Sequence, residues 1–179
     1  MTAQIPDNFI YRGEEYALVG KEGDGLLTPL DYGMRPVMIH TACYRGFYCA
    51  YLVTEDGLYL TNMTVRTADD VYPVVDGYQP SVRDFTAIYR DMRILTNFTG
   101  KLRLARDFIE ELYIHMGFQK PSAFRTVLDF QFSEGKLQNI TDLSAYYAEM
   151  RGKFKEQYER DPNFPQRIND AFSLDLDVD

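Results

Sequence analysis

Short runs in which apolar and polar residues alternate recur along the chain. Phe47–Thr54 and Leu58–Val65 alternate in this way and are separated by Glu-Asp-Gly. Side chains on a β-strand point to opposite faces with a period of two, and Asp-Gly between two such runs is a strong signal for a tight turn. The pattern therefore predicts a β-hairpin over residues 47–65. The same signal predicts, in chain order, a hairpin over residues 9–19 that turns at Gly13-Glu14, a strand at Val37–Thr41, a strand over residues 101–106 and a hairpin over residues 126–141 that turns at Ser133–Gly135.

The segment 81–95 departs from this alternation, because its apolar residues recur at helical spacing. Ser81 stands where an N-cap belongs, and Asp84 follows three residues later, as in a capping box. The spacing predicts a helix over residues 82–95. A strand from Thr86 to Met92 is the alternative.

Two further helices are predicted from their start and stop signals. Asp107 precedes an apolar-periodic run that Gly117 ends, which predicts a helix over residues 107–117. Asp142 precedes a longer run that predicts a helix to about Arg160. The apolar face of this last helix comprises Leu143, Tyr147, Met150, Phe154 and Tyr158. A single helical turn, with Thr28 as its N-cap and Pro29 first, is expected in the glycine-rich loop before residue 37.

These elements together indicate a single α+β domain over residues 1–172. Its sheet would be mainly antiparallel, because hairpins rather than crossover helices join the strands, and two or three helices would accompany it. The tail, residues 173–179, alternates Leu or Val with Asp. Charge concentrated at a terminus is typical of solvated chain, so we expect an acidic, loosely held C-terminal tail.

Composition and charge narrow the classes of partner. The chain has 179 residues, a net charge of −8 and 14 tyrosines. An acidic protein is poorly suited to bind nucleic acid, which requires basic side chains against the phosphates. No apolar run is long enough for a membrane span and no leader pattern opens the sequence. We therefore expect a soluble, cytoplasmic protein without a nucleic-acid or membrane partner.

The cysteines and histidines raise the question of catalysis. Cys43 and Arg45 lie close together in the sequence, and His115 lies far along it. A cationic neighbour can lower the pKa of a thiol and make it a nucleophile, whereas a free cysteine in a strand is more often a small buried apolar residue. The same choice holds for His115, which is either an acid–base group or a histidine at a helix C-terminus. The spacing gives no metal signature, and we expect neither a metal nor a cofactor.

A basic strip interrupts the acidic sequence. Residues 83–106 carry six basic and two acidic side chains. Arginines gathered in this way can bind a carboxylate or phosphate through paired hydrogen bonds, or they can pair with carboxylates of their own chain. The candidate ligand-binding residues are Arg93, Lys101, Arg103 and Arg106.

Pro29–Tyr51 and Phe98–Gln119, together with the hairpin at 126–141, resemble a family of small bacterial cytoplasmic proteins of unassigned function. The resemblance spans most of residues 9–145. It implies a bacterial single-domain protein and supplies no catalytic residue.

Three functional interpretations stay open. The leading hypothesis is a non-catalytic protein-binding module of the immunity-protein or antitoxin type, whose partner is a basic protein. It depends on the acidic, tyrosine-rich composition and on the lack of any common catalytic fingerprint in the sequence. The alternative is a small-molecule enzyme or anion-ligand-binding domain that uses the Cys43/Arg45 turn and the basic strip. A purely structural subunit is the third possibility.

Overall fold

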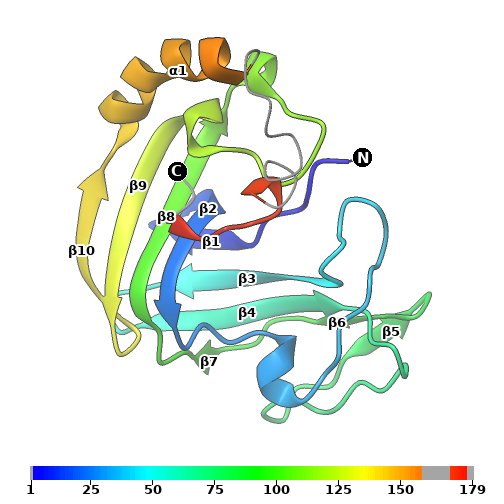
Figure 1. Cartoon of the computed structure of the whole chain (residues 1–179). Coiled ribbons are helices and arrows are strands. Elements are labelled where there is room, and N and C mark those ends of the chain that lie inside the picture. Colours follow the sequence, from blue (N-terminus) through cyan, green and yellow to red (C-terminus); the bar gives the residue numbers. More distant parts are fainter. Residues whose placement is uncertain (1, 159–169, 177–179) are drawn as a thin grey trace.

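The computed structural model describes residues 2–158 and 170–176, which form one large mixed β-sheet with a single α-helix among them (Figure 1). The strands are β1 Asn8–Tyr11, β2 Glu14–Asp24, β3 Phe47–Val53, β4 Leu58–Val65, β5 Ser81–Arg83, β6 Thr86–Tyr89, β7 Ile94–Leu95, β8 Thr99–Phe108, β9 Phe124–Ser133 and β10 Lys136–Asp142. Helix α1 spans Ser144–Tyr158, and short 3-10 turns lie at Pro29–Tyr32, Glu110–Leu112 and Pro121–Ala123.

The strand order is β10-β9-β8-β2-β1-β3-β4-β6-β5, with β7 beside β4. Short β1 is the centre of this order, because it pairs with β2 on one side and with β3 on the other. Its pairing with β3 is parallel, whereas its pairing with β2 is antiparallel. In Figure 1, β3 and β4 run across the direction of β8 and β9, so the sheet bends sharply around β1.

The main core fills the inside of this bend. Alternate residues of the strands point into it, and the rings of Phe9 and Tyr51 stack at 4.7 Å between centroids. Phe130 and Phe132 of β9 enter from the other half of the sheet. A second, smaller cluster lies on the outer face of β8 and β9, where Tyr147 of α1 packs against Ala105 and Val127. Helix α1 therefore covers the outer face of one half of the sheet only.

The predicted hairpins are confirmed. The hairpins expected over 47–65 and 126–141 are β3–β4 and β9–β10. The one expected over 9–19 is β1–β2, but it turns at Arg12-Gly13 and not at Gly13-Glu14, because Glu14 pairs with Tyr11. The strand expected over 101–106 lies within β8, and Thr28 and Pro29 begin a 3-10 turn as predicted. The last predicted helix is α1, whose Ser144 N–H donates to Asp142 Oδ1. Its predicted end at Arg160 lies outside the described residues.

The predicted α+β class with two or three helices is wrong, because two of the predicted helices do not form among the described residues. Residues 81–95 make β5, β6 and β7, and the hairpin β5–β6 turns at Asp84-Phe85. The alternative strand from Thr86 is therefore the better prediction for this segment. The apolar residues that looked like one helical face belong to separate strands, and β6 and β7 both pair with β4.

The helix predicted over 107–117 is also wrong. Strand β8 continues to Phe108, which pairs with Phe124, and Ile109 N–H then donates to Ala123 O. Asp107 thus lies within β8, with a φ of 60°, and no helix begins after it. Only the 3-10 turn Glu110–Leu112 follows.

The strand predicted at Val37–Thr41 is wrong as well. Val37 N–H bonds to Arg66 O, but the following residues turn back, and Cys43 N–H bonds to His40 O. No neighbouring strand therefore runs alongside the segment. None of the helices among residues 2–158 and 170–176 is long and apolar enough to cross a membrane.

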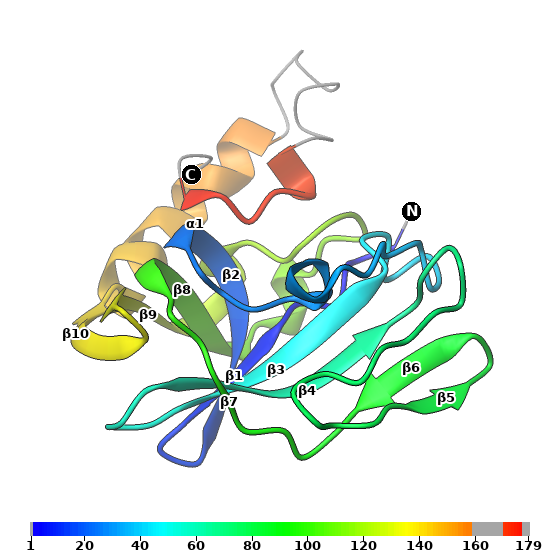
Figure 2. The same ribbon diagram turned by 90° about the horizontal axis from the view of Figure 1, so that it is seen from below.

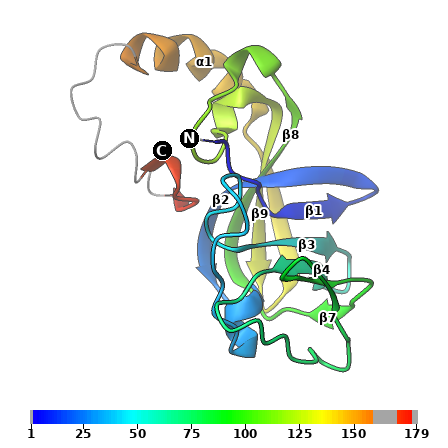
Figure 3. The ribbon, with the colours of Figure 1, turned by 90° about the vertical axis from the view of Figure 1, so that its right-hand side faces the viewer.

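The C-terminal segment 170–176 returns to the sheet beside β2 (Figures 2 and 3). Lys21 N–H donates to Leu174 O, and Phe118 N–H donates to Ala171 O. The side chain of Leu174 packs against the main core. Residues 177–179 lie outside the described part, so the loosely held tail stays a prediction.

Candidate functional site

Cys43 is buried in the structure, with 1% of its surface exposed. Its Sγ lies 3.5 Å from Phe47 O, which fits a weak thiol hydrogen bond. Burial raises the pKa of this thiol above its ordinary value, although Arg45 acts in the opposite direction. Cys49 is equally enclosed, and burial raises its pKa further. Both groups are therefore neutral thiols at physiological pH, which does not favour nucleophilic chemistry.

Arg45 is engaged by Asp7. Nη2 of Arg45 lies 2.7 Å from Oδ1 of Asp7, and Nη1 lies 3.0 Å from Oδ2. Burial lowers the pKa of Arg45, but the Asp7 carboxylate more than offsets this, so the pKa lies above its ordinary value. The guanidinium also sits over the rings of Phe47 and Phe118. Arg45 is thus a fixed cation whose charge Asp7 neutralises.

His115 lies apart from these groups. It is exposed on the segment after the 3-10 turn Glu110–Leu112, and its ring meets Tyr113 edge to face at 4.8 Å. Its ring makes neither a hydrogen bond nor a ring contact with Cys43 or Arg45. The structure therefore does not bring the three weak catalytic candidates into one site.

The basic strip divides between two faces of the sheet and several partners. Lys101 and Arg103 lie on the outer face of β8, where Arg103 holds Asp129 through two hydrogen bonds and donates to Tyr147 Oη. Arg106 faces the other way, over Tyr16, and pairs with Glu14. Arg93 lies beyond β6, over the ring of Tyr59. Internal pairing thus engages Arg103 and Arg106, and the four residues do not converge on one ligand position.

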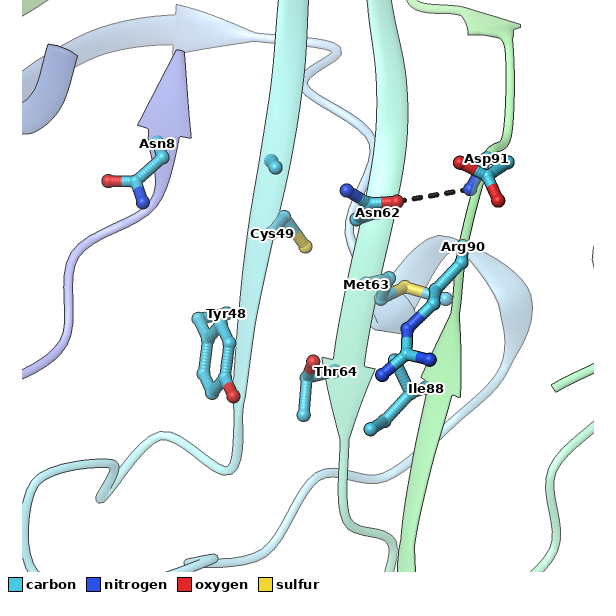
Figure 4. Close-up of a pocket in the computed structure, with 10 residues that line it drawn as sticks. Asn8, Tyr48, Cys49, Asn62, Met63, Thr64, Ile88, Arg90 and Asp91 are labelled. Atoms are coloured by element: carbon cyan, nitrogen blue, oxygen red, sulfur yellow. Dashed lines mark hydrogen bonds between the residues drawn. The ribbon is translucent and has the colours of Figure 1, made fainter. Parts of the chain in front are cut away.

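A hollow of about 370 Å³ lies on the outer face of the uncovered half of the sheet (Figure 4). Two rows of paired residues make its floor: Asn8, Ala50 and Asn62, and beside them Tyr48, Thr64 and Ile88. Arg90 extends along one side, and the Asp91 N–H donates to Asn62 Oδ1 at 3.1 Å. The hollow offers hydrogen-bonding groups from Asn8, Tyr48, Asn62 and Thr64.

A larger pocket of about 450 Å³ lies just before the start of β1, next to Asp7. It opens where β2 and β3 separate, and Asp7 and Arg45 are at its base. About half of the residues that line it are leucine or phenylalanine, and the others are glycine, polar or charged residues. Cys43 and His115 do not line it.

The third candidate is the loop–hairpin surface, which comprises the loop 66–80 and the hairpin β5–β6. Tyr72 Oη of the loop donates to Phe85 O at the tip of the hairpin, so the two segments lie side by side. Four large apolar side chains on this surface are half exposed or more: Val71 60%, Val74 50%, Val82 56% and Phe85 66%. Four exposed aspartates accompany them: Asp69, Asp70, Asp76 and Asp84. Arg66 and Arg83 belong to the same segments, Arg83 lies 3.7 Å from Asp84, and Arg35 lies 3.6 Å from Asp69. The surface is therefore apolar, with more acidic than basic side chains.

Phe85 adopts an uncommon backbone conformation. Asp84 and Phe85 form the two-residue turn of the hairpin, with φ of 50° and 62°. This left-handed region suits glycine or asparagine, and it costs other residues roughly 1–2 kcal/mol. A strained turn that also exposes an aromatic ring is typical of a functional position.

No catalytic constellation appears among the described residues. They contain no group of three or more His, Cys, Asp or Glu side chains that could hold a metal ion. Sequence reasoning missed Asp7 and Phe85, the two most informative residues. For Phe85, the alternation on both sides of Asp84-Phe85 was available as a signal, but the helical spacing obscured it. For Asp7, whose partner lies 38 residues away, the sequence offered none.

No protein-family model, no curated protein and no solved structure matches the chain. The resemblance to a family of small bacterial proteins therefore stays a prediction.

Proposed function

We propose that this chain is a non-catalytic protein-binding module of a bacterial cytoplasm, of the immunity-protein or antitoxin type. Its binding site is the loop–hairpin surface, and its partner is a basic protein. The observation that carries the proposal is Phe85, which is 66% exposed at the tip of a strained turn. A cytoplasmic location agrees with two free, buried cysteines.

The composition of the loop–hairpin surface fits such a partner. Exposed apolar side chains that gather on one surface are typical of interaction sites, and an aromatic ring is a common energetic centre of an interface. The four aspartates outnumber Arg66 and Arg83 on this surface, which gives it the sign of the whole chain, whose net charge is −8. Charge complementarity would speed association with a basic partner and make it sensitive to salt.

The edge position of β5 adds backbone groups to the site. Strand β5 is last in the strand order, and its three residues are exposed. A strand at the edge of a sheet presents unpaired N–H and C=O groups that a partner strand can use. A partner could therefore pair with β5 while it covers Phe85.

The alternative, an enzyme or anion-binding domain, has less support. Arg45 is neutralised by Asp7, and the basic strip does not converge. The buried thiols lack an activating base in contact with them.

The proposal is tested by site-specific photo-cross-linking in the cells that make the protein. A photoreactive phenylalanine replaces Phe85, and in a control chain it replaces Tyr146, which is similarly exposed on α1. We expect a cross-linked partner with a basic isoelectric point from position 85 and not from position 146. Equal cross-linking from both positions, or no adduct from position 85, would contradict the proposal.

The partner identified in this way is then titrated against purified chains. Phe85→Ala should weaken binding by at least about tenfold, the effect of losing an interface centre. Tyr146→Ala should leave binding unchanged, and added salt should weaken it. Binding that survives Phe85→Ala would assign the contact to another surface.

A further inference from the structure

We infer that the pocket between the separating ends of β2 and β3 is a binding site for a small, neutral, largely apolar molecule that carries a hydrogen-bond acceptor. This inference is independent of the proposed function, because the pocket and the loop–hairpin surface share no residue.

The pocket follows from the length of β1. Strand β1 pairs with β2 only over Glu14–Ala17 and with β3 only over Ala50–Val53. Before Asn8 no strand lies between them, so the remainder of β2 and the start of β3 separate. Asp7 occupies the point of separation, where its backbone O accepts from Leu18 N–H and its Oδ1 accepts from Cys49 N–H.

Apolar side chains from five parts of the chain border the space beyond Asp7. They are Leu18, Leu26, Phe47, Phe118, Phe172 and Leu174. A volume of about 450 Å³ lies within the range of small-molecule sites, which are mostly apolar with a few fixed polar groups. The walls therefore suit a ligand with an aromatic or branched aliphatic body.

Arg45 supplies the fixed polar group. Of its five N–H groups, two donate to Asp7 and one donates to Ile5 O. The Nε–H is buried and unpaired, so one Nη1 N–H is left for a ligand. Its side chain is 24% exposed, and it lines the pocket. Asp7 and the two phenylalanine rings hold it in place. Arg45 can thus donate to a ligand acceptor without moving.

The charges around the pocket select a neutral ligand. Asp7 cancels Arg45 at the base, and Asp24 and Asp31 outnumber Lys21 at the rim. An anionic ligand would face these carboxylates, which outnumber the single lysine, Lys21. A cationic ligand would place its charge beside Arg45. A neutral carbonyl or amide oxygen can accept a hydrogen bond from Arg45 without repulsion from the carboxylates or from the guanidinium.

The C-terminal segment completes the site. Phe172 and Leu174 line the pocket, and Phe172 packs edge to face against Tyr44. The backbone bonds from Lys21 and Phe118 hold the segment in place on both sides of Phe172. Changes to this segment should therefore change ligand affinity while the sheet stays intact.

Three ligands that share one ring system separate the effect of charge from that of shape. Naphthamide, naphthoate and naphthylmethylammonium are titrated into the isotope-labelled full chain, and backbone amide resonances are followed by NMR. We expect naphthamide to bind with a dissociation constant of about 1 mM or tighter, from its thirteen or so heavy atoms. The shifted resonances should be those of Lys21, Gly23, Gly25 and Phe118. The two charged ligands should bind at least about tenfold more weakly. Equal binding of all three, or shifts centred elsewhere, would overturn the inference.

Two pairs of variants then locate the contact. Phe172→Ala should weaken naphthamide binding by at least about threefold, whereas Phe85→Ala, the same change outside the pocket, should not. Leu30→Ala, at the exposed rim, should also weaken it, and Leu95→Ala on the outer face should not. Thermal melting confirms that each variant is folded. Leu30 is exposed, so this second pair keeps the test valid if Phe172→Ala fails to fold. Unchanged binding in Leu30→Ala and Phe172→Ala would overturn the inference and leave the proposed function untouched.

Discussion

Asp7 and Arg45 meet at the start of β1, with Nη2 of Arg45 2.7 Å from Oδ1 of Asp7. Only 4% of the Asp7 side chain is exposed, and the same Oδ1 accepts from the Cys49 N–H. The pair therefore links the N-terminal segment, the turn before β3 and β3 itself. It holds the two halves of the bent sheet together where no strand lies between them.

Replacement of Arg45 by Met should destabilise the fold substantially. The change leaves Asp7 as a buried carboxylate without its cation, which costs about 3 kcal/mol in free energy of unfolding. Chemical denaturation measures the loss. Arg106→Met is the matched control, because its pair with Glu14 is exposed and should contribute less than about 1 kcal/mol. Similar losses in both variants would show that burial of the Asp7–Arg45 pair is unimportant.

Both cysteines should resist alkylation in the folded protein. Cys43 and Cys49 are buried, and burial raises the pKa of each thiol. Iodoacetamide at neutral pH should label them only at the rate of unfolding, whereas chain unfolded in denaturant should react at once. Peptide mapping assigns the adducts. Rapid labelling of Cys43 in native protein would restore the catalytic interpretation.

Asp142 should stabilise α1 from its N-terminal end. Its Oδ1 accepts from Ser144 N–H at 2.8 Å, and hydrogen bonds from the Ser144 side chain and backbone lower its pKa. Asp142→Ala should cost about 1 kcal/mol, and Asp142→Asn should cost less. Because the folded-state pKa is lowered, this contribution is present above the unfolded pKa of about 3.9 and is lost as the pH falls through the folded value. Denaturation series at several acidic pH values should show a smaller pH dependence for Asp142→Ala than for the wild type.

Stability should decline at alkaline pH through buried tyrosines. Burial, with a smaller effect from Tyr72, raises the pKa of Tyr89 to about 12, and its Oη donates to Pro73 O. A raised folded-state pKa favours the protonated form, so this contribution is complete below the unfolded pKa of about 10 and is lost as the pH rises toward 12. Tyr89→Phe should flatten this decline and remove the hydrogen bond, at a cost of about 1 kcal/mol at neutral pH. An unchanged alkaline decline in that variant would assign the effect to other groups.

Phe85→Gly should raise stability. Glycine adopts a φ of 62° without steric cost, so relief of the strained turn should add about 1 kcal/mol to the free energy of unfolding. The greater conformational entropy of glycine in the unfolded chain reduces this gain. The same variant should bind the proposed partner more weakly. Val82→Ala on β5 is the control for loss of an exposed apolar side chain without a change in the turn. A destabilised Phe85→Gly would show that the phenyl ring is held by packing and that the turn is not strained.

The hairpins were predictable because their signals are local. Glu55-Asp56-Gly57 joins two alternating runs, and the paired strands need no information from elsewhere in the chain. Helix α1 was predictable for the same reason, since Asp142 and the periodic run after it stand together in the sequence.

The two wrong helices fail because short apolar runs fit more than one period. In residues 112–116 the half-buried side chains are Leu112, Ile114 and Met116, which is the period of two of extended chain. In residues 81–95, Asp84-Phe85 turns with positive φ, although neither residue type requires it. Strand β6 pairs with β5 in this hairpin and with β4, and β7 pairs with β4; the pairings with β4 are not local.

The candidate sites were less predictable than the fold. The basic strip was visible in the composition of the sequence. The partners of Arg103 and Arg106 depend on which face of β8 each side chain occupies, and the sequence does not show this. The pocket depends on Asp7, Arg45, Phe118 and Phe172, which only the folded sheet brings together.

The position of β1 between β2 and β3 has a consequence for the order of folding. Strand β1 is synthesised first, but its neighbour β3 is complete only when Val53 has been added. Strand β2 gains its second neighbour, β8, only when Phe108 has been added. Pairings this distant in sequence close slowly, because the entropy of the intervening chain is lost before contacts form. During synthesis, β2 therefore stands with an open edge until more than half of the chain has emerged. The nascent chain should be most prone to aggregation, and most dependent on chaperones, in this interval.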